Sequence, residues 1–300
     1  MREPGRFICG KRTRTALQVK GRLPSSNLHK PFGWPPSPPF VHQNAVRPHP
    51  PLKARYEKLA DKPEYVNRLF DKGACHYDGI VDWGFFRTGG AYRKWVQERH
   101  GLKKGDRVLD VACGTGLVAL AASRILGTAE NITCLDPSEG MLAVARTKLN
   151  ATFVVGRAEA LPFPDNTFDF LTMGYALRHV SDLEETFREY RRVLKPGGRL
   201  LILEVTKPSG RIPRFMFRTY FGRIYPTLTQ WFTRSTDARD MMRYYWETMD
   251  TCVPPESVLS ALASVGLSEV NRCTQLGLFS EYTATKPPPA PGSDPAPRSA

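Results

Sequence analysis

Two acidic residues follow two neighbouring apolar segments of the chain, and a glycine-rich turn lies between them. Residues 107–120 read RVLDVACGTGLVAL, which predicts a buried strand that ends near Asp110 and passes through Gly114 and Gly116 into a helix. A second apolar run ends in Asp136. A carboxylate at the tip of that strand is placed to accept hydrogen bonds from ribose hydroxyls. The spacing therefore predicts a site for a nucleoside-containing cofactor.

The glycine turn by itself admits two cofactors. Its GTGLVA sequence fits the G-x-G-x-x-A pattern of NAD-binding folds, although so short a match is weak. Asp110 separates the alternatives. A carboxylate at this position would repel the pyrophosphate of a dinucleotide, but it would attract the amino group and sulfonium of S-adenosylmethionine. The charge therefore favours S-adenosylmethionine.

Apolar runs and helical patterns alternate along the middle of the chain, as in a parallel sheet covered by helices. After the first two strands the pattern predicts a helix at 139–150, strands at 151–155 and 168–173, a helix at 183–194, a strand at 199–205, a helix at 254–265, and strands at 267–273 and 277–285. The last two strands are expected to pair as a closing hairpin. The KPGG sequence at 195–198 is expected to end the helix before it.

The net charge of +14 is concentrated in two places. Residues 1–56 contain 11 Lys and Arg against one acid, and residues 207–234 contain six basic side chains and no acid. The rest of the chain is slightly acidic. Strand four is followed by MGYALRH, which lacks the Asn/Asp-Pro-Pro-aromatic sequence of base-modifying methyltransferases. We therefore expect no nucleic-acid partner.

The composition predicts three segments. These are a disordered, basic and proline-rich extension at 1–56, a catalytic domain at 57–285 with a lid insertion at about 207–250, and a disordered tail at 286–300. No stretch is long and apolar enough to predict a membrane-spanning helix. The six cysteines form no CxxC pair, so we expect no metal site and a reduced, cytoplasmic protein. If the acid-poor residues 6–22 are a transit peptide, the alternative location is the mitochondrial matrix.

Longer motifs resemble known methyltransferases. The glycine turn and VLKPGGR at 193–199 are shared by the class I S-adenosylmethionine-dependent methyltransferases. The sequences YVNRLFDKGACHYD at 65–78, LPFPDNTFD at 161–169, ALRHV at 176–180 and RYYW at 243–246 look like the narrower ubiquinone/menaquinone biosynthesis C-methyltransferase family. This resemblance implies a Rossmann-like α/β fold with a seven-stranded, mostly parallel sheet, a C-terminal antiparallel hairpin, a helical N-terminal cap and a helical lid after strand five. It also implies methyl transfer to a polyprenylated benzoquinol or naphthoquinol ring.

The resemblance also assigns residues to the cofactor. Thr115 and Asp136 would hold its methionine end and its ribose. Arg157 and Ala158 would flank the adenine, and Gly174 would lie against the sulfonium. With the turn and the first acid, the expected cofactor set is Asp110, Gly114, Thr115, Gly116, Asp136, Arg157, Ala158 and Gly174.

The expected acceptor side of the site departs from the family pattern. Tyr77 and Asp78 would close the pocket, but the Asn expected a few residues after this pair is missing. Arg157 stands where relatives carry Asn or Asp, and His179 stands where the quinone-modifying enzymes carry Asn. Another small molecule or lipid is therefore the alternative acceptor. A non-catalytic cofactor-binding protein is a further alternative.

Three residues after strand four are the catalytic candidates: Tyr175, Arg178 and His179. Methylation of a dihydroxy ring requires a phenolic proton with a pKa of about 10 to be removed or shared. We expect Arg178 to stabilise the developing phenolate or to order a water molecule. His179 is an alternative base, and the opposing interpretation is that it only packs.

The insertion at 207–234 combines arginines and aromatic residues. Arg211, Arg214 and Arg218 recur at helical spacing, and an apolar stripe is expected from Phe217, Phe221, Ile224 and Leu228, with a kink at Pro226. Such a lid suits peripheral contact with an anionic membrane and a lipophilic acceptor. An ordinary lid that packs on the sheet is the alternative. A homodimer is also left open.

Overall fold

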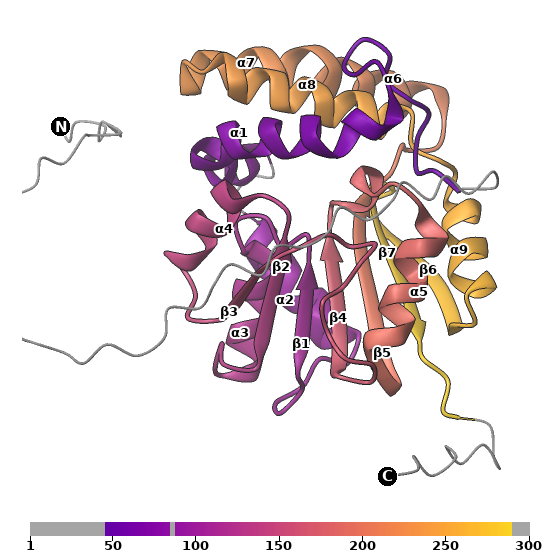
Figure 1. The fold of residues 1–300 in the computed structure, drawn as a ribbon. Coiled ribbons are helices and arrows are strands. Elements are labelled where there is room, and N and C mark those ends of the chain that lie inside the picture. Colours follow the sequence, from indigo (N-terminus) through magenta and orange to yellow (C-terminus); the bar gives the residue numbers. More distant parts are fainter. Residues whose placement is uncertain (1–45, 85–87, 290–300) are drawn as a thin grey trace, which may run out of the picture. The chain divides into compact units, whose positions relative to one another are not determined.

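The computed structural model describes residues 46–84 and 88–289, in which seven strands form one sheet (Figure 1). The strand order is β3-β2-β1-β4-β5-β7-β6, and only the pairings of β7 are antiparallel. The strands are β1 (Val108–Val111), β2 (Ile132–Asp136), β3 (Thr152–Val155), β4 (Phe168–Gly174), β5 (Leu194–Val205), β6 (Ser268–Gln275) and β7 (Phe279–Thr285). The expected Rossmann-like sheet with its closing hairpin is confirmed.

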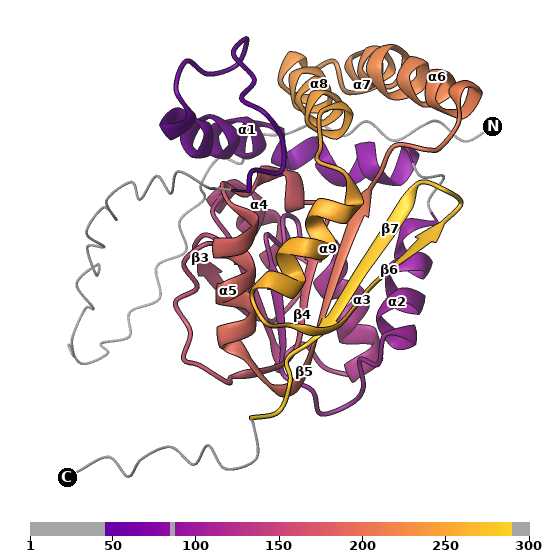
Figure 2. The ribbon, with the colours of Figure 1, turned by 90° about the vertical axis from the view of Figure 1, so that its right-hand side faces the viewer.

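Helices cover both faces of this sheet (Figure 2). The helices are α1 (Lys62–Gly84), α2 (Gly89–Arg99), α3 (Leu117–Leu126), α4 (Glu139–Arg146), α5 (Leu183–Val193), α6 (Arg211–Thr219), α7 (Tyr225–Thr233), α8 (Thr236–Asp250) and α9 (Pro255–Ser264). Apolar side chains of α5 and α9 pack in one core cluster with the sheet. Those of α2, α3 and α4 pack in a second cluster. Because both faces are buried, the central strands are mostly apolar rather than alternating, and exceptions such as Asp110, Thr172 and Glu204 are buried polar residues near the strand ends.

Strand five differs from its expected position. It begins at Leu194 instead of Arg199, and its pairing with β4 jumps from Phe168–Leu194 to Phe170–Arg199. The KPGG sequence therefore bulges within the strand instead of forming a separate turn after α5. Gly197 adopts a φ of 78° there, a conformation that glycine reaches without steric cost.

A helical layer lies beyond the carboxyl ends of the parallel strands and contains α1, α6, α7 and α8 (Figures 1 and 2). A π-helical turn, Tyr220–Ile224, joins α6 to α7, and Pro226 stands in the first turn of α7. The insertion is fastened to α1, because the Tyr225 hydroxyl donates to the Ile80 carbonyl at 2.7 Å. Its two ends also meet, since Lys207 Nζ donates to the Asp250 carbonyl at 2.6 Å.

The domain boundaries require two corrections. Residues 46–56 were expected to be disordered, but they pack on the domain: the Val46 carbonyl accepts from Leu183 N at 2.9 Å, and Arg55 pairs with Glu247 at 2.7 Å. Lys286 was assigned to the disordered tail, yet its backbone pairs with Gly197 and Gly198. Residues 1–45 and 290–300 lie outside the described residues. Among the residues that are described, no helix is long and apolar enough to cross a membrane.

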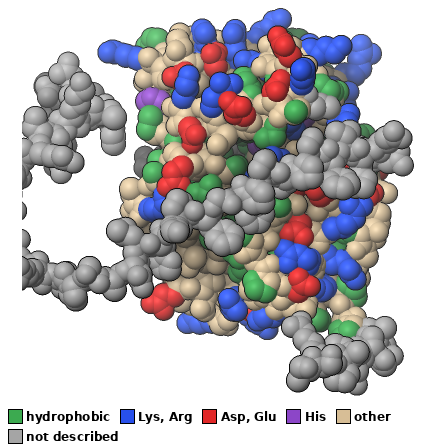
Figure 3. All heavy atoms as spheres, viewed as in Figure 1, with side chains coloured by type: hydrophobic (Ala, Val, Ile, Leu, Met, Phe, Trp, Pro, Cys, Tyr) green, Lys and Arg blue, Asp and Glu red, His purple; other side chains and the backbone are tan. Residues whose placement is uncertain are grey.

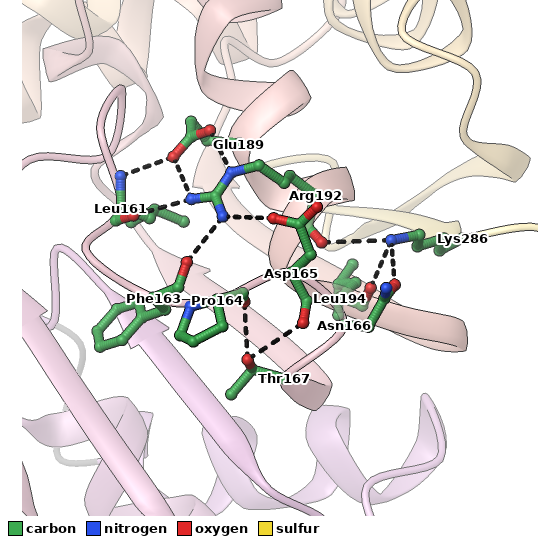
Figure 4. A network of polar contacts seen from close by, with 10 residues as sticks. All are labelled: Leu161, Phe163, Pro164, Asp165, Asn166, Thr167, Glu189, Arg192, Leu194 and Lys286. Atoms are coloured by element: carbon green, nitrogen blue, oxygen red, sulfur yellow. Dashed lines mark hydrogen bonds and ion pairs between the residues drawn. The ribbon is translucent and has the colours of Figure 1, made fainter. Parts of the chain in front are cut away.

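The LPFPDNTFD segment is held by Arg192 of α5 (Figure 4). The Arg192 guanidinium donates to the carbonyls of Leu161 and Phe163 and pairs with Asp165 and Glu189, all at 2.7–2.8 Å. This loop needs such a clamp because it contains two prolines and forms no regular secondary structure. The contacts seen in Figure 4 give this family-specific motif a role in holding the fold together.

Replacing Arg192 by Gln should destabilise the fold by about 2 kcal/mol, because two carbonyls and two carboxylates lose their shared donor. Urea denaturation measures this loss. Arg188→Gln is the matched control on the same helix, and it should cost less than about 0.5 kcal/mol because its pair with Glu184 is solvent-exposed. Equal losses in the two variants would remove the special role of Arg192.

Candidate functional site

The glycine turn forms an open floor at the carboxyl end of β1. Gly114 and Gly116 have φ values of 55° and 78°, which glycine adopts most readily. A Cβ on Gly116 would press on Ala145 and Leu149 at 3.2–3.3 Å, whereas a Cβ on Gly114 would meet no atom within 4 Å. Gly116 is therefore required for packing against α4. The space beside Gly114 is available to a ligand.

Asp136 ends β2 beside this floor and is 6% exposed. Its Oδ2 accepts from Gly114 N at 2.7 Å, and its Oδ1 accepts from Ser138 N at 2.8 Å. A carboxylate has about four lone-pair sites, so it can accept two more hydrogen bonds, as a ribose diol would require. Burial raises the pKa of Asp136 to about 6, although the two backbone donors oppose the shift.

Asp110 is fully buried at the end of β1. Its oxygens accept from Thr172 Oγ1 of β4 at 2.9 Å and from Ala119 N of α3 at 3.0 Å. Burial raises its pKa to about 7. These contacts show that Asp110 joins two strands to the helix after the turn. Its expected direct contact with the cofactor's cationic group stays a prediction.

Two carboxylates of helix α1 reach the site: Asp78 contacts the glycine turn, and Asp71 contacts the start of α4. Asp78 accepts from Thr115 Oγ1 at 2.5 Å and also pairs with Lys148, while Asp71 accepts from Gly140 N at 2.9 Å and from Ser138 Oγ. Sequence reasoning found Asp78 but missed Asp71 and Lys148. The signal was present, because Asp71 and Asp78 stand seven residues apart and so share one face of a helix.

The residues at the exit of β4 lie close to the same turn. A Cβ on Gly174 would meet Val118 of α3 at 2.6 Å, so the position admits only glycine unless Val118 moves. Tyr175 follows with a φ of 62°, and Ala112 at the neighbouring exit of β1 has a φ of 52°. Left-handed residues other than glycine are strained, and such residues gather at functional sites. The exits of these two neighbouring strands thus each contain a strained residue.

The loop after β3 carries Arg157 and Ala158, the expected neighbours of the adenine. Ala158 is buried, whereas Arg157 is exposed and contacts Ser181 Oγ at 3.2 Å and Glu159 at 3.5 Å. The role of Arg157 at the adenine is untested and stays a prediction.

Arg178 is the largest fully buried side chain among the described residues. It forms an ion pair with Glu204, which ends β5, and its guanidinium carbon lies 3.7 Å from the ring centroid of Tyr245 in α8. Burial lowers its pKa, but Glu204 together with Tyr245 and Tyr77 more than offsets this, so the pKa lies above its ordinary value and Arg178 stays cationic. Its Nε and Nη2 have no hydrogen-bond partner among the described residues. Two nitrogens of this buried guanidinium are thus unpaired.

His179 packs among aromatic rings. It stacks on Tyr244 at 5.5 Å between ring centroids and meets Phe70 edge-on at 5.2 Å. Both ring nitrogens are buried without a hydrogen-bond partner in the described part of the chain. Burial, helped by the nearby charge of Arg178, holds the pKa of His179 well below its ordinary value of 6.5. His179 is therefore neutral at physiological pH.

Tyr77 and Tyr175 complete the acceptor side. Burial raises the pKa of each phenol, so both stay protonated near neutral pH. Neither can act as a general base in that state. The structure thus gathers Tyr77, Tyr175, Arg178 and His179 beneath α8. Sequence reasoning missed Glu204, although an acid at the end of the apolar run RLLILEV marks it.

Comparison with known proteins identifies the family. The model of the ubiE/COQ5 methyltransferase family matches residues 58–279. The chain belongs to this family. A demethylmenaquinone methyltransferase of Symbiobacterium thermophilum is 36% identical over 75% of this chain and 94% of its own. The ubiquinone/menaquinone biosynthesis C-methyltransferase UbiE of Saccharophagus degradans is 35% identical over 77% and 96% of the two chains.

A solved structure has the same fold. An S-adenosylmethionine-dependent methyltransferase of Thermotoga maritima superposes with a TM-score of 0.53 at 19% identity, covering 74% of this chain and 99% of its own. The chain is thus a class I methyltransferase with S-adenosylmethionine as its cofactor. The described residues fit this group, because Gly114 leaves open space beside a carboxylate that retains acceptor capacity.

Cofactor affinity should fall as the pH decreases through about 6, because protonation of Asp136 removes acceptor capacity for the ribose. Below its pKa the loss should approach about tenfold per pH unit. Calorimetric titration with S-adenosylmethionine between pH 5 and 8 measures it. Asp110 titrates nearby, so the contribution of Asp136 is the difference between the parent and Asp136→Asn profiles.

Asp136→Asn should bind more weakly at pH 8 and show a flatter profile. Glu130→Gln, an exposed acid outside the site, is the control and should reproduce the parent profile. Parallel profiles for the parent and Asp136→Asn would show that another group governs cofactor binding.

Proposed function

We propose that the protein transfers a methyl group from S-adenosylmethionine to a ring carbon of a hydroquinone-type quinone precursor with a lipophilic tail. The observation that carries this proposal is the buried Arg178, which keeps its charge and two free donors among aromatic side chains. A cation in an aromatic enclosure suits an aromatic ring that bears an ionisable hydroxyl. The names of the relatives support the same acceptor class.

Bound S-adenosylmethionine supplies an electrophilic methyl group on a sulfonium leaving group. The chain's part is to align the acceptor carbon with that methyl, since positioning supplies much of the rate. Asp136 and the glycine turn would fix the ribose end of the cofactor. Gly174 would let α3 approach the exit of β4 closely, because the Val118 side chain takes the place that a Cβ on Gly174 would occupy.

Arg178 would direct its Nε and Nη2 at the acceptor oxygen as negative charge develops there. This stabilisation makes the ring carbon more nucleophilic and lowers the cost of losing the phenolic proton. Since Tyr77 and Tyr175 remain protonated and the pKa of buried His179 is held low, the phenolic proton would pass to water. After methyl transfer the ring carbon would lose its hydrogen as a proton and the oxygen would be reprotonated, so that one proton is released for each methyl group transferred. Glu204 would act as a positioning residue that holds the guanidinium through its third nitrogen.

Replacing Arg178 by Gln should lower kcat by about 100-fold or more while changing the Kd for S-adenosylmethionine little. The substitution also leaves the buried Glu204 without its ion-pair partner, which destabilises the fold. The double variant Arg178→Gln and Glu204→Gln removes this second effect and should still be inactive. Equal losses in turnover and cofactor affinity would remove Arg178 from the catalytic role.

Cells that lack the protein should accumulate a desmethyl quinone, because the ring carbon is no longer methylated. Mass spectrometry of extracted quinones measures it, and the signal should disappear when the gene is restored but not when the Arg178→Gln variant is supplied. A normal quinone profile together with a different unmethylated lipid would favour the alternative acceptor class.

The remaining partner assignments are proposals of the same kind. We infer that a lipophilic acceptor is taken from a membrane surface beside the lid at 207–234, and that nucleic acid is not a partner. Support for the second point is the placement of basic residues, which gather on the lid rather than around the glycine turn.

A further inference from the structure

Helix α6 exposes a row of large apolar side chains. Ile212, Phe215 and Met216 are 74%, 71% and 64% exposed. Their spacing of three and four residues places them on one face of the helix, and we call this set the α6 stripe. Contiguous exposed apolar surface marks an interaction site. The expected stripe was different, because it was built from Phe217, Phe221, Ile224 and Leu228.

The opposite face of α6 is already packed. Phe217 is buried, with its ring 4.7 Å from that of Phe221 and 5.8 Å from that of Trp246 in α8. The helix therefore attaches to the protein through Phe217 and does not need the α6 stripe for folding. One apolar face of the helix is therefore held by the protein, and the other is free to contact an apolar partner outside it.

Basic side chains border the α6 stripe. Arg211, Arg214 and Arg218 follow one another at three and four residues, are exposed, and lie on the side of the helix between its two apolar faces. No acid occurs between 207 and 234. Many Lys and Arg side chains appear along the upper edge of Figure 3, where Figure 1 places α6, α7 and α8. Every charged side chain of the insertion between 207 and 234 is therefore basic.

The same helical run exposes further aromatic surface at the end of α7. Trp231 is 72% exposed and Phe232 is 57% exposed, with their rings in edge-on contact at 4.9 Å. Arg223 and Arg234 stand on either side of α7 in the sequence. Tryptophan with arginine is the composition of helices that lie at a membrane interface.

We propose that the α6 stripe inserts into the headgroup region of an anionic lipid bilayer, with Arg211, Arg214 and Arg218 bound to lipid phosphates. Charge complementarity selects this occupant over a second copy of the chain. In a two-fold contact through this face each arginine row would meet its own copy, and like charges would oppose association. The proposal deepens the proposed function, on which it rests for the lipophilic acceptor.

This placement connects the bilayer to the acceptor side of the site. Phe217, Phe221 and Tyr245 belong to one apolar cluster, and the Tyr245 ring lies against Arg178. A ring with a hydrocarbon tail could thus reach Arg178 from the lipid side while its tail remains in contact with apolar side chains of the lid.

Co-sedimentation of the full chain with vesicles tests the docking surface. Binding is expected to vesicles of phosphatidylcholine with phosphatidylglycerol, to be far weaker to phosphatidylcholine alone, and to fall at 0.5 M salt because the shorter Debye length screens the arginines. Replacing Arg211, Arg214 and Arg218 by Gln should weaken partitioning by about 100-fold at low salt. Replacing Ile212, Phe215 and Met216 by Ser should weaken it by about tenfold or more.

Matched controls separate this surface from general effects. Leu276→Ser removes another highly exposed apolar side chain, and the triple replacement of Lys103, Lys104 and Arg124 by Gln removes the same charge elsewhere. Both controls should bind vesicles as the parent does. Equal losses in the controls, or no salt-sensitive binding by the parent, would overturn the proposal. Loss of self-association in the α6 variants without any vesicle binding would instead assign the surface to a second copy.

Turnover measured on two acceptors distinguishes failure of the docking proposal from failure of the proposed function. The α6 stripe variant should lose turnover of a long-tailed quinol presented in vesicles, yet keep the parent rate within about twofold on a short-tailed, water-soluble quinol. If neither quinol is methylated by the parent, the acceptor assignment fails while the vesicle measurement still decides the docking. Equal loss on both acceptors would contradict the docking role.

Discussion

The buried carboxylate of Asp110 is the constraint on which the site depends. One group at the end of β1 accepts from the β4 residue Thr172 and from the first turn of α3, so two strands and a helix are joined at a single point. The glycine turn lies between those contacts and takes its position from them. An unpaired carboxylate at zero exposure would be costly, and its two donors offset that cost. The hydrogen bonds of this buried carboxylate therefore hold the glycine turn in place.

Acidic side chains lie on the cofactor side of the site, and a basic side chain lies on the acceptor side. Asp110, Asp136 and Asp78 place acidic groups on the side that receives a cationic donor. Arg178 places the opposite charge on the side where an acceptor oxygen would become negative. Each half of the site thus favours the charge that its ligand carries or develops. Burial opposes the negative charge of Asp110 and Asp136 by raising their pKa, whereas Glu204 helps Arg178 to stay cationic.

The fold and the cofactor side were predictable because they depend on local patterns: apolar runs, the GTG turn, and acids at strand ends. The predicted start of β5 was wrong by five residues. The KPGG sequence has the local pattern of a turn, and only the pairing of β5 with β4 shows that it is a bulge. The sequence marks Asp71 by its spacing from Asp78 and Glu204 by its place at the end of an apolar run, but their partners lie on elements far apart in the chain. Spacing alone therefore could not identify the contacts that these two acids make. The sequence also did not reveal that residues 46–56 are ordered, because their contacts with Leu183 and Glu247 join residues far apart in the chain.

The hydrogen bond between Lys207 and the Asp250 carbonyl closes the insertion at its base. About forty residues therefore leave the sheet and return to nearly the same place, without contributing a strand to it. Changes in the length of this excursion therefore need not shift the register of the sheet. The acceptor side can then vary while the strands that carry the glycine turn keep their pairing.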